Sequence, residues 1–512
     1  MISVFSVESN FPMRTINHHI DTRAAEQPDA IYLIAPETGA QMTYRDLQAD
    51  SRRLGRVLYA RGYAKGDKIG LMLHNGYQTA RLLLGLMYAG FVAVPLNLLS
   101  QRSQLEYVLD HSDTRLVFTS AELEPQLRQA LAGVARDIGV QVIDPDAMTV
   151  FATVPDAALP AIAPADDALL MYTSGTTGRP KGVLHGHRSV VAGGEFTSSA
   201  HRLAASDRVL CALPLYHING QIVTTVAPLV HGGSVVMPHR FSVSNYWELV
   251  ARHRCTWINV VPTIIAYLLN APHPREQGHD ISRVKFCRSA SAPLPPELHR
   301  AFEDRFGLSI IETFGMTETN APCFTNPYEP SRRKIGSPGQ AYGNEAKVID
   351  PQTGADLPPH APGEVMIRGD NVMKGYYKDP ENTAKTLRPD GWMHSGDLGY
   401  LDDDGFLFVT GRIKELIIKG GENIAPREID EALLRHPAVL EAAAVGIPDP
   451  SYGQEIMACV VVKPGVSCTV EELAAFSRAE LGPYKTPKLI RLVDALPKGP
   501  SGKVQRLKLL ES

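Results

Sequence analysis

Apolar residues in the first part of the chain alternate between helical spacing and short continuous runs. Residues 44–61 place Leu47, Leu54 and Leu58 on one side of a helix. Further helices are predicted at 77–89 and 104–110, and buried strands at 68–73, 91–95 and 115–119. Strands and helices that alternate in this way predict a largely parallel sheet with helices on both faces.

The same alternation resumes after a proline-rich segment. Residues 155–166 hold three prolines among alanines, which is typical of a linker. From 334 to 402 the density of Gly, Pro and Asp predicts a small β subdomain with long loops and without helices. The other elements predicted beyond the linker are helices at 189–200, 243–253, 426–435 and 470–481, and strands at 209–212, 234–237, 442–446 and 456–462.

Together these patterns predict an α/β protein of two unequal domains. Residues 1–412 form a large N-terminal domain with parallel sheets flanked by helices plus the β subdomain, and residues 413–512 form a small α+β domain. The predicted subdomains of the large domain are residues 1–165, 166–333 and 334–412.

The composition narrows the range of functions. The chain has 512 residues, with 51 Lys and Arg against 55 Asp and Glu, and a net charge of −4. This balance provides no basic field, which argues against nucleic acid as a main partner. The six cysteines lack metal-site spacing and are expected to be reduced. Without a signal-peptide pattern or the ~18-residue apolar run of a membrane span, we expect a cytoplasmic protein. The sequence offers no support for an oligomer.

A loop rich in Gly, Ser and Thr directly follows the apolar stretch 168–172. Its backbone N–H groups, its hydroxyls and one lysine are suited to wrapping a polyphosphate. It lacks the Gly-Lys-Ser/Thr ending of a Walker loop, and flexible linkers often share its composition. The predicted phosphate-binding residues are Thr173, Ser174, Gly175, Thr176, Thr177, Gly178 and Lys181.

At this loop the sequence resembles the adenylate-forming superfamily, which includes acyl-CoA synthetases, firefly-type luciferases and the adenylation domains of peptide synthetases. The resemblance recurs in the family's order from about residue 43 to residue 503. It implies that the small domain is a mobile lid with its hinge at Lys414. It also implies ATP, Mg²⁺ and CoA as the cofactors and a small-molecule carboxylic acid as the substrate.

The resemblance assigns nucleotide binding to further segments. Phe314 matches the ring that packs on adenine, although Ala290 and Ser291 replace glycines that many relatives carry beside it. Asp397 and Arg412 match the residues that hold the ribose. The residues of the adenine and phosphate segments are Ala290, Ser291, Ala292, Pro293, Glu312, Thr313, Phe314, Gly315, Met316 and Thr317.

The resemblance also implies which residues take part in catalysis. Lys503 matches the lysine that bridges the attacking carboxylate and the α-phosphate, with Lys498 close enough to be confused with it. Thr317 matches the hydrogen-bond donor to the α-phosphate, and Glu318 matches the carboxylate that helps to hold Mg²⁺, a cation that prefers oxygen ligands. Gly420 and Gly421 match the place where the pantetheine arm of CoA passes.

The residues of the acyl pocket indicate which kind of acid the protein binds. Its predicted residues are His217, Asn219, Val261, Arg288 and Gly315. The resemblance also implies that His217 is a catalytic residue, because it matches the ring that shifts as the carboxylate enters. No Asp stands near His217 to hold an α-ammonium group, which favours an acid without one. The sequence looks most like oxalate–CoA ligases and small-acid synthetases. On its predicted strand Arg288 alternates with Val284 and Phe286, so it could face the pocket and hold a second carboxylate. A structural ion pair is the favoured explanation of this arginine.

Several functions remain open from the sequence. The leading one is an acid–CoA ligase that forms acyl-AMP and pyrophosphate and then the CoA thioester. The apolar Ile218 and Val260 would suit a long-chain fatty-acid or carnitine-type ligase. Transfer to a carrier-protein phosphopantetheine is a further alternative, although the insertion typical of fatty-acyl-AMP ligases is not evident. The two other functions left open are a luciferase-like oxygenase and a non-catalytic nucleotide-binding regulator.

Overall fold

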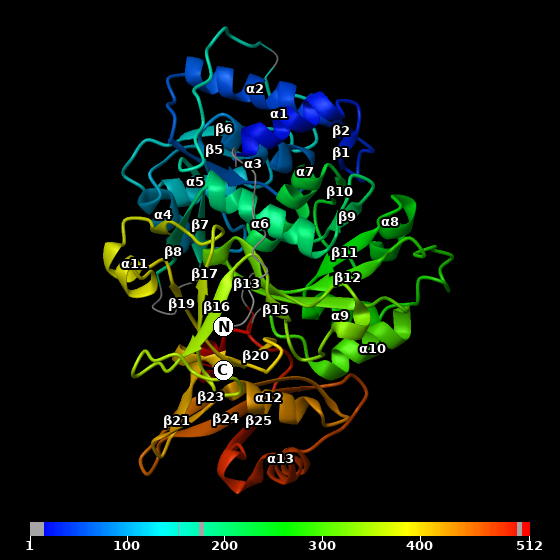
Figure 1. Ribbon diagram of the computed structural model, residues 1–512, viewed down its shortest axis with the longest axis vertical. Coiled ribbons are helices and arrows are strands. Elements are labelled where there is room, and N and C mark those ends of the chain that lie inside the picture. Colours follow the sequence, from blue (N-terminus) through cyan, green and yellow to red (C-terminus); the bar gives the residue numbers. More distant parts are fainter. Residues whose placement is uncertain (1–14, 152, 174–178, 499–503, 512) are drawn as a thin grey trace.

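The computed structural model describes residues 15–151, 153–173, 179–498 and 504–511. Two large sheets with their helices form most of the molecule, a small antiparallel sheet lies beside them, and a fourth sheet holds the C-terminal residues at one end (Figure 1). The predicted fold class, α/β with a large N-terminal and a small C-terminal domain, is confirmed.

The first sheet has seven strands in the order β18-β8-β7-β4-β3-β5-β6. Its core is parallel, and β8 and β18 join one edge in antiparallel pairing. Helix α2 begins at a capping box in which the Thr43 hydroxyl accepts from the Asp46 N–H. The elements of this part are β3 Lys68–Met72, β4 Val92–Pro95, β5 Thr114–Thr119, β6 Gly139–Val142, β7 Asp167–Thr173, β8 Lys181–Gly186 and β18 Gly375–Tyr376, with α2 Tyr44–Ala60, α3 Tyr77–Tyr88, α4 Arg102–His111 and α5 Glu124–Leu131.

The second sheet has nine strands in the order β15-β14-β13-β12-β11-β9-β10-β1-β2. Strands β1 and β9 to β13 run parallel to their neighbours in its centre. Its strands are β1 Ile31–Ile34, β2 Gln41–Thr43, β9 Arg208–Cys211, β10 Ser234–Val236, β11 Trp257–Val260, β12 Phe286–Ser289, β13 Ile310–Met316, β14 Ala321–Thr325 and β15 Gln340–Ala341. Its helices are α1 Ile16–Glu26, α6 His187–Ala200, the π-helix η1 Asn219–Val226, α7 Ala227–His231, α8 Tyr246–Arg252, α9 Pro262–Leu269 and α10 Pro296–Phe306.

The sheets do not follow the predicted subdomain limit at residue 165. Strands β7 and β8 lie beyond it and complete the first sheet, while β1 and β2 lie before it and complete the second. Backbone hydrogen bonds between strands far apart in the sequence determine which sheet each strand joins. The local pattern of apolar residues does not predict these pairings. The domain limit at residue 412 and the subdomain limits remain predictions.

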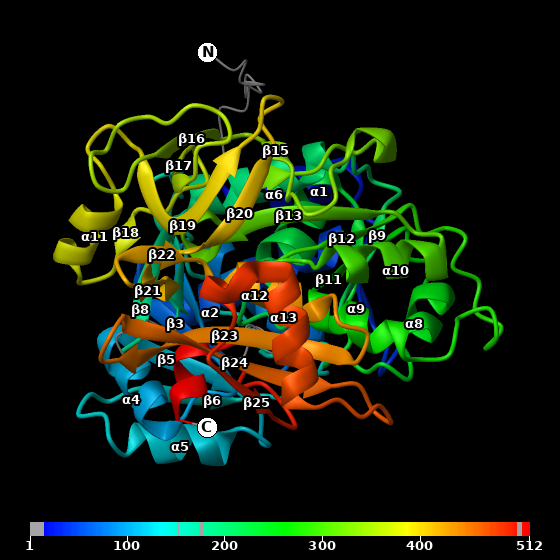
Figure 2. The same ribbon diagram turned by 90° about the horizontal axis from the view of Figure 1, so that it is seen from below.

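The remaining two sheets are mostly antiparallel. The third has the order β16-β17-β19-β20, and in the fourth β25 pairs with β24 outside the order β22-β21-β24-β23. Helices α12 and α13 pack together on one side of the fourth sheet (Figure 2). The elements are β16 Glu345–Ile349, β17 Gly363–Arg368, β19 Met393–Leu401, β20 Leu407–Arg412, β21 Ile417–Lys419, β22 Glu422–Ile424, β23 Val439–Asp449, β24 Gly453–Val462 and β25 Leu489–Leu492, with α11 Pro380–Thr386, α12 Pro426–Leu434 and α13 Val470–Lys485.

The prediction that residues 334–402 contain no helix is wrong, because α11 lies there. This polar helix has no buried residue, so it leaves no apolar period to detect. Its start is fixed by Asp379, whose carboxylate accepts from the Asn382 N–H, and by Pro380 in the first turn.

Two further sequence expectations can be compared with the structure. All six cysteines are free thiols, and five of them are buried. Over the described part of the chain, no helix combines the length and the apolar character that crossing a membrane requires.

Candidate active site

Four of the predicted site segments lie at one edge of the second sheet. Strands β9, β11, β12 and β13 are parallel, so their carboxyl ends lie side by side. Each is followed by a predicted site segment: Asn219 follows β9, Val261 follows β11, residues 290–293 follow β12, and Thr317 follows β13. Ligands of open α/β sheets bind at this edge. The topology therefore brings together segments that are almost a hundred positions apart in the sequence.

Asp397 and Arg412 form the most clearly defined ion pair of the site. They lie opposite each other on β19 and β20, and Arg412 Nε donates to Asp397 Oδ1 over 2.8 Å. Asp397 is buried, and its charge is the main cause that raises the pKa of Arg412. The pair thus presents a carboxylate that can accept from the hydroxyls of a sugar diol beside a guanidinium that can donate to them.

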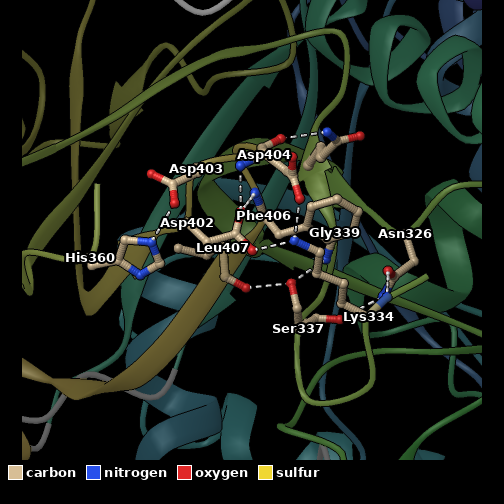
Figure 3. Close-up of polar contacts among 11 residues, drawn as sticks. Asn326, Lys334, Ser337, Gly339, His360, Asp402, Asp403, Asp404, Phe406 and Leu407 are labelled. Atoms are coloured by element: carbon tan, nitrogen blue, oxygen red, sulfur yellow. Dashed lines mark hydrogen bonds and ion pairs between the residues drawn. The ribbon is translucent and has the colours of Figure 1, made fainter. Parts of the chain in front are cut away.

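The hairpin that carries this pair is fastened at its other end (Figure 3). Lys334 Nζ lies 2.6 Å from Asp402 Oδ2 and 2.7 Å from Asp404 Oδ2, in the turn between β19 and β20. The Ser337 hydroxyl donates to the Leu407 carbonyl over 2.6 Å. These contacts tie the hairpin to the loop before β15, so Asp397 and Arg412 stand on a rigid support.

The phosphate-binding prediction falls on the hairpin between β7 and β8. Thr173 and Lys181 lie opposite each other where the two strands end. Lys181 Nζ lies 4.7 Å from the centre of the Tyr376 ring, a cation–π contact. Burial and the nearby Lys414 lower the pKa of Lys181. The predicted residues Ser174, Gly175, Thr176, Thr177 and Gly178 lie outside the described residues.

Glu318 is placed by the short helix η2 (Thr317–Thr319) that follows β13. The Tyr376 hydroxyl donates to Glu318 Oε1 over 3.0 Å, and the Met373 N–H donates to the Glu318 carbonyl. His185 Nε2 lies 2.8 Å from the Thr317 carbonyl oxygen, and burial lowers the pKa of this histidine to about 4. The neutral imidazole therefore acts as a donor that holds the Thr317 turn.

A magnesium ion fits this donor set. Among the residues that the structure describes, no group of three or more His, Cys, Asp and Glu side chains could hold a metal ion. Mg²⁺ bound with a nucleotide needs one or two carboxylates and takes its other ligands from phosphates and water. A single carboxylate oriented by a tyrosine, as at Glu318, meets this requirement.

The predicted adenine segments lie around the ends of β12 and β13. Ala290 is buried, and Ser291 adopts a left-handed backbone conformation with φ +72°, so the chain turns sharply there. Glu312 is buried, its Oε1 accepts from the Leu294 N–H, and burial raises its pKa. Thr313 is also buried. The partly buried residues of these segments are Ala292, Phe314, Gly315, Met316 and Thr317, while Pro293 is exposed.

The acyl-pocket residues form a polar network around a buried guanidinium. Arg288 is only 2% exposed. Its Nη1 donates to Asn219 Oδ1 over 3.0 Å and to Asn259 Oδ1 over 2.9 Å. No carboxylate pairs with it in the described part of the chain, so the alternative of a structural ion pair gains no support. The ring of His217, two residues before Asn219 in the sequence, packs on the ring of Tyr216. Val261, two residues after Asn259 in the sequence, is buried.

The small domain carries the remaining predicted residues. Lys414 is exposed on the short helix η4 (Ile413–Glu415) between β20 and β21. Gly420 and Gly421 form the exposed turn between β21 and β22, both with positive φ. The side chain of Lys419 is buried at the base of this turn, 2.9 Å from Glu455 Oε1. Lys503 lies outside the described residues.

Sequence reasoning missed Tyr376 and Asn259, which the structure places at the site. Tyr376 reaches Glu318 because the two-residue strand β18 pairs with β8. Asn259 reaches Arg288 because β11 and β12 are in register at these positions. An amide in the otherwise apolar run of β11 was the available signal for Asn259; nothing local marked Tyr376.

Comparison with known proteins shows similarity to AMP-binding enzymes, both in sequence and in structure. The model of the AMP-binding enzyme family matches residues 20–377, and that of the AMP-binding enzyme C-terminal domain matches residues 428–503. The sulfoacetate–CoA ligase of Cupriavidus necator is 57% identical over 96% of each chain. The oxalate–CoA ligase of Arabidopsis thaliana is 35% identical over 89% of this chain and 90% of its own. The structure of ATP-bound MatB from Rhodopseudomonas palustris has a TM-score of 0.89 and 30% identity over 97% of this chain and 98% of its own.

Proposed function

This chain belongs to the AMP-binding enzyme family and is an AMP-forming acid–CoA ligase, and we propose that its acid is a short organic acid, with sulfoacetate as the leading candidate. The observation that supports the reaction is the convergence of Lys181, Glu318 and the Asp397–Arg412 pair at one edge of the site. The 57% identity to a sulfoacetate–CoA ligase supports the choice of acid.

In the first half-reaction the substrate carboxylate attacks the α-phosphorus of ATP, and the bond to pyrophosphate breaks. A carboxylate is already nucleophilic at neutral pH, so the site needs no general base. Its task is to reduce repulsion between anions and to stabilise charge on the phosphoryl oxygens. We assign this task to Lys181 and Lys503, and to the Thr317 hydroxyl as a donor to the α-phosphate.

Glu318 would hold Mg²⁺, which supplies positive charge to the phosphate oxygens when bound. Tyr376 orients the carboxylate for this role and places its ring against Lys181. Asp397 would accept the ribose hydroxyls while Arg412 fixes its carboxylate. The sequence suggested the roles of Glu318, Asp397 and Arg412. It did not suggest the two contacts of Tyr376, with Glu318 and with Lys181.

In the second half-reaction the CoA thiolate attacks the carbonyl carbon of acyl-AMP, and AMP leaves. The Gly420–Gly421 turn is exposed at the tip of its hairpin, where a side chain at Gly421 would meet no atom within 4 Å. We propose that rotation about Lys414 carries this turn toward the acyl-AMP and lets the pantetheine arm pass over its bare backbone. We place the reaction in the cytoplasm because it consumes ATP and CoA.

Pyrophosphate release with a panel of acids tests the proposal. Sulfoacetate, oxalate, malonate, acetate, coumarate and palmitate are each supplied with MgATP, with and without CoA. We expect thioester formation with a short acid and a strict need for CoA in turnover. Faster turnover with palmitate, or transfer to a carrier-protein phosphopantetheine but not to CoA, would refute the assignment.

A further inference from the structure

We propose that Arg288, held by Asn219 and Asn259, forms a subsite for a second anionic group of the acid, so that the enzyme selects short dianions over monoanions. The inference rests on the proposed acid–CoA ligase function and deepens it. It identifies the part of the pocket that distinguishes a sulfoacetate-like acid from acetate.

The hydrogen bonds of Arg288 leave the Nε of its guanidinium without a partner. Both bonds described for Arg288 use Nη1, and its Nε is buried without a hydrogen-bond partner. Nε and Nη2 form the edge of a guanidinium that binds an oxyanion through two parallel N–H···O bonds. The asparagines thus fix the orientation of Arg288 through Nη1, and its unpartnered Nε remains to donate to an anion.

The charge of Arg288 makes a purely structural role costly. A guanidinium removed from water loses much of its solvation unless an anion replaces it. Burial lowers the pKa of Arg288 to about 9, so it is still protonated at neutral pH. Two titratable groups of the described residues that interact with it, His201 and Cys287, do not neutralise it. Burial lowers the pKa of His201 to about 3 and raises that of Cys287, so both are uncharged at pH 7.

The network runs from the buried guanidinium to the adenylation site. Since Asn219 Oδ1 accepts from Arg288, its Nδ2 faces Ser291, to whose hydroxyl oxygen it donates over 3.0 Å. The hydroxyl hydrogen of Ser291 remains able to donate to a ligand, and Ser291 is only partly buried. An acid with one end on Arg288 would therefore have its other end near the segment that we assign to AMP. A sulfonate and a carboxylate offer the same kind of oxygens to this fork.

The test compares the kcat/KM of three acids in pyrophosphate release with MgATP and CoA: sulfoacetate, malonate and acetate. We expect the wild-type enzyme to prefer at least one dianion over acetate by about 100-fold or more. Arg288→Gln should lower that ratio by about 100-fold, and Arg288→Lys, which keeps the charge without the fork, by about 10-fold. The better of sulfoacetate and malonate identifies the second anion as sulfonate or carboxylate.

Arg208→Gln is the matched control. Arg208 is a partly buried arginine on β9 of the same sheet, where it donates to Ser234 and to the His253 carbonyl, and burial lowers its pKa too. The ratio should stay within about twofold of the wild type, since Arg208 lies at the opposite end of the strands. Circular dichroism verifies folding, and Arg288→Lys decides the result if Arg288→Gln does not fold.

An unchanged ratio in the folded Arg288 variant would overturn the subsite. So would a wild-type enzyme that uses acetate as well as the dianions, although the CoA ligase function would then stand. If the wild-type enzyme ligates none of the three acids but ligates a long-chain or aromatic acid, both the short-acid assignment and the subsite fail.

Discussion

Replacing Tyr376 by Phe removes one hydroxyl and leaves the ring in place. The lost interaction is the 3.0 Å hydrogen bond from Tyr376 to Glu318 Oε1. Burial and Glu318 raise the pKa of Tyr376, so the hydroxyl is a neutral donor to a charged acceptor at neutral pH. Such bonds contribute about 1.5–3 kcal/mol, and the partial exposure of this pair favours the lower end. A loss of about 1.5 kcal/mol corresponds to a roughly 10-fold weaker hold on Mg²⁺.

The assay is pyrophosphate release as a function of free Mg²⁺ at fixed ATP, together with calorimetric titration of MgATP. We expect the half-saturating Mg²⁺ concentration of Tyr376→Phe to rise about 10-fold while the KM of the acid changes little. The Phe ring keeps the cation–π contact with Lys181, so ATP binding at saturating Mg²⁺ should be nearly retained.

The neighbouring Tyr377 provides a matched control. Its hydroxyl also donates to a carboxylate, Asp113 Oδ2 over 2.7 Å, but this pair makes no described contact with Glu318. Tyr377→Phe should leave the Mg²⁺ dependence unchanged. If both variants shift it equally, or if neither does, the reasoning that Tyr376 orients the metal ligand is refuted.

Four further predictions address other parts of the enzyme. Asp397→Asn should raise the KM of ATP about 100-fold in steady-state kinetics, since the ribose loses a charged acceptor; a change in the acid KM alone would contradict this. Lys503→Ala should abolish acyl-AMP formation in a pyrophosphate assay while thioester formation from supplied acyl-AMP survives; equal loss of both would refute the assignment. Lys419→Met leaves the buried Glu455 uncompensated and should lower the free energy of unfolding by about 3 kcal/mol in denaturant titrations, with recovery in Lys419→Met/Glu455→Leu. Burial lowers the pKa of Arg288 to about 9, so the sulfoacetate-to-acetate ratio of kcat/KM should fall about 10-fold or more between pH 8 and pH 10.5; a flat ratio over this range would contradict the subsite.

The elements that the sequence predicted have local signals. They are helices α2, α3, α4, α6, α8, α12 and α13 and strands β3, β4, β5, β9, β10, β23 and β24. The helix predicted at 44–61 ends one residue earlier, at Ala60, and its start follows from the capping box at Thr43. Helix α11 escaped prediction because it buries no side chain, and its one signal is a polar cap. Strand β18 has two residues, too few for any period to be visible.

The candidate site was predictable only as a set of segments. Resemblance assigned roles to Glu318, Asp397 and Arg412, and the structure brings the last two together in an ion pair. It did not decide whether Arg288 forms a structural ion pair or faces a ligand. We propose that it faces a ligand, because the register of β11 against β12 sets Asn259 beside Arg288 and the side chain is buried.

The sequence by itself determined the reaction class, because adenylation and thioester formation depend on motifs whose residue types and order can be read along the chain. The tertiary structure alone decided how the residues of these motifs are supported, as where Tyr376 donates to Glu318 and Arg412 donates to Asp397. Arg288 is an ordinary arginine in the sequence. We propose it as an anion site because folding removes it from water, pairs its Nη1 with amides in place of a carboxylate, and leaves its Nε without a hydrogen-bond partner. Burial and strand pairing create that condition, and neither is a local property of the chain.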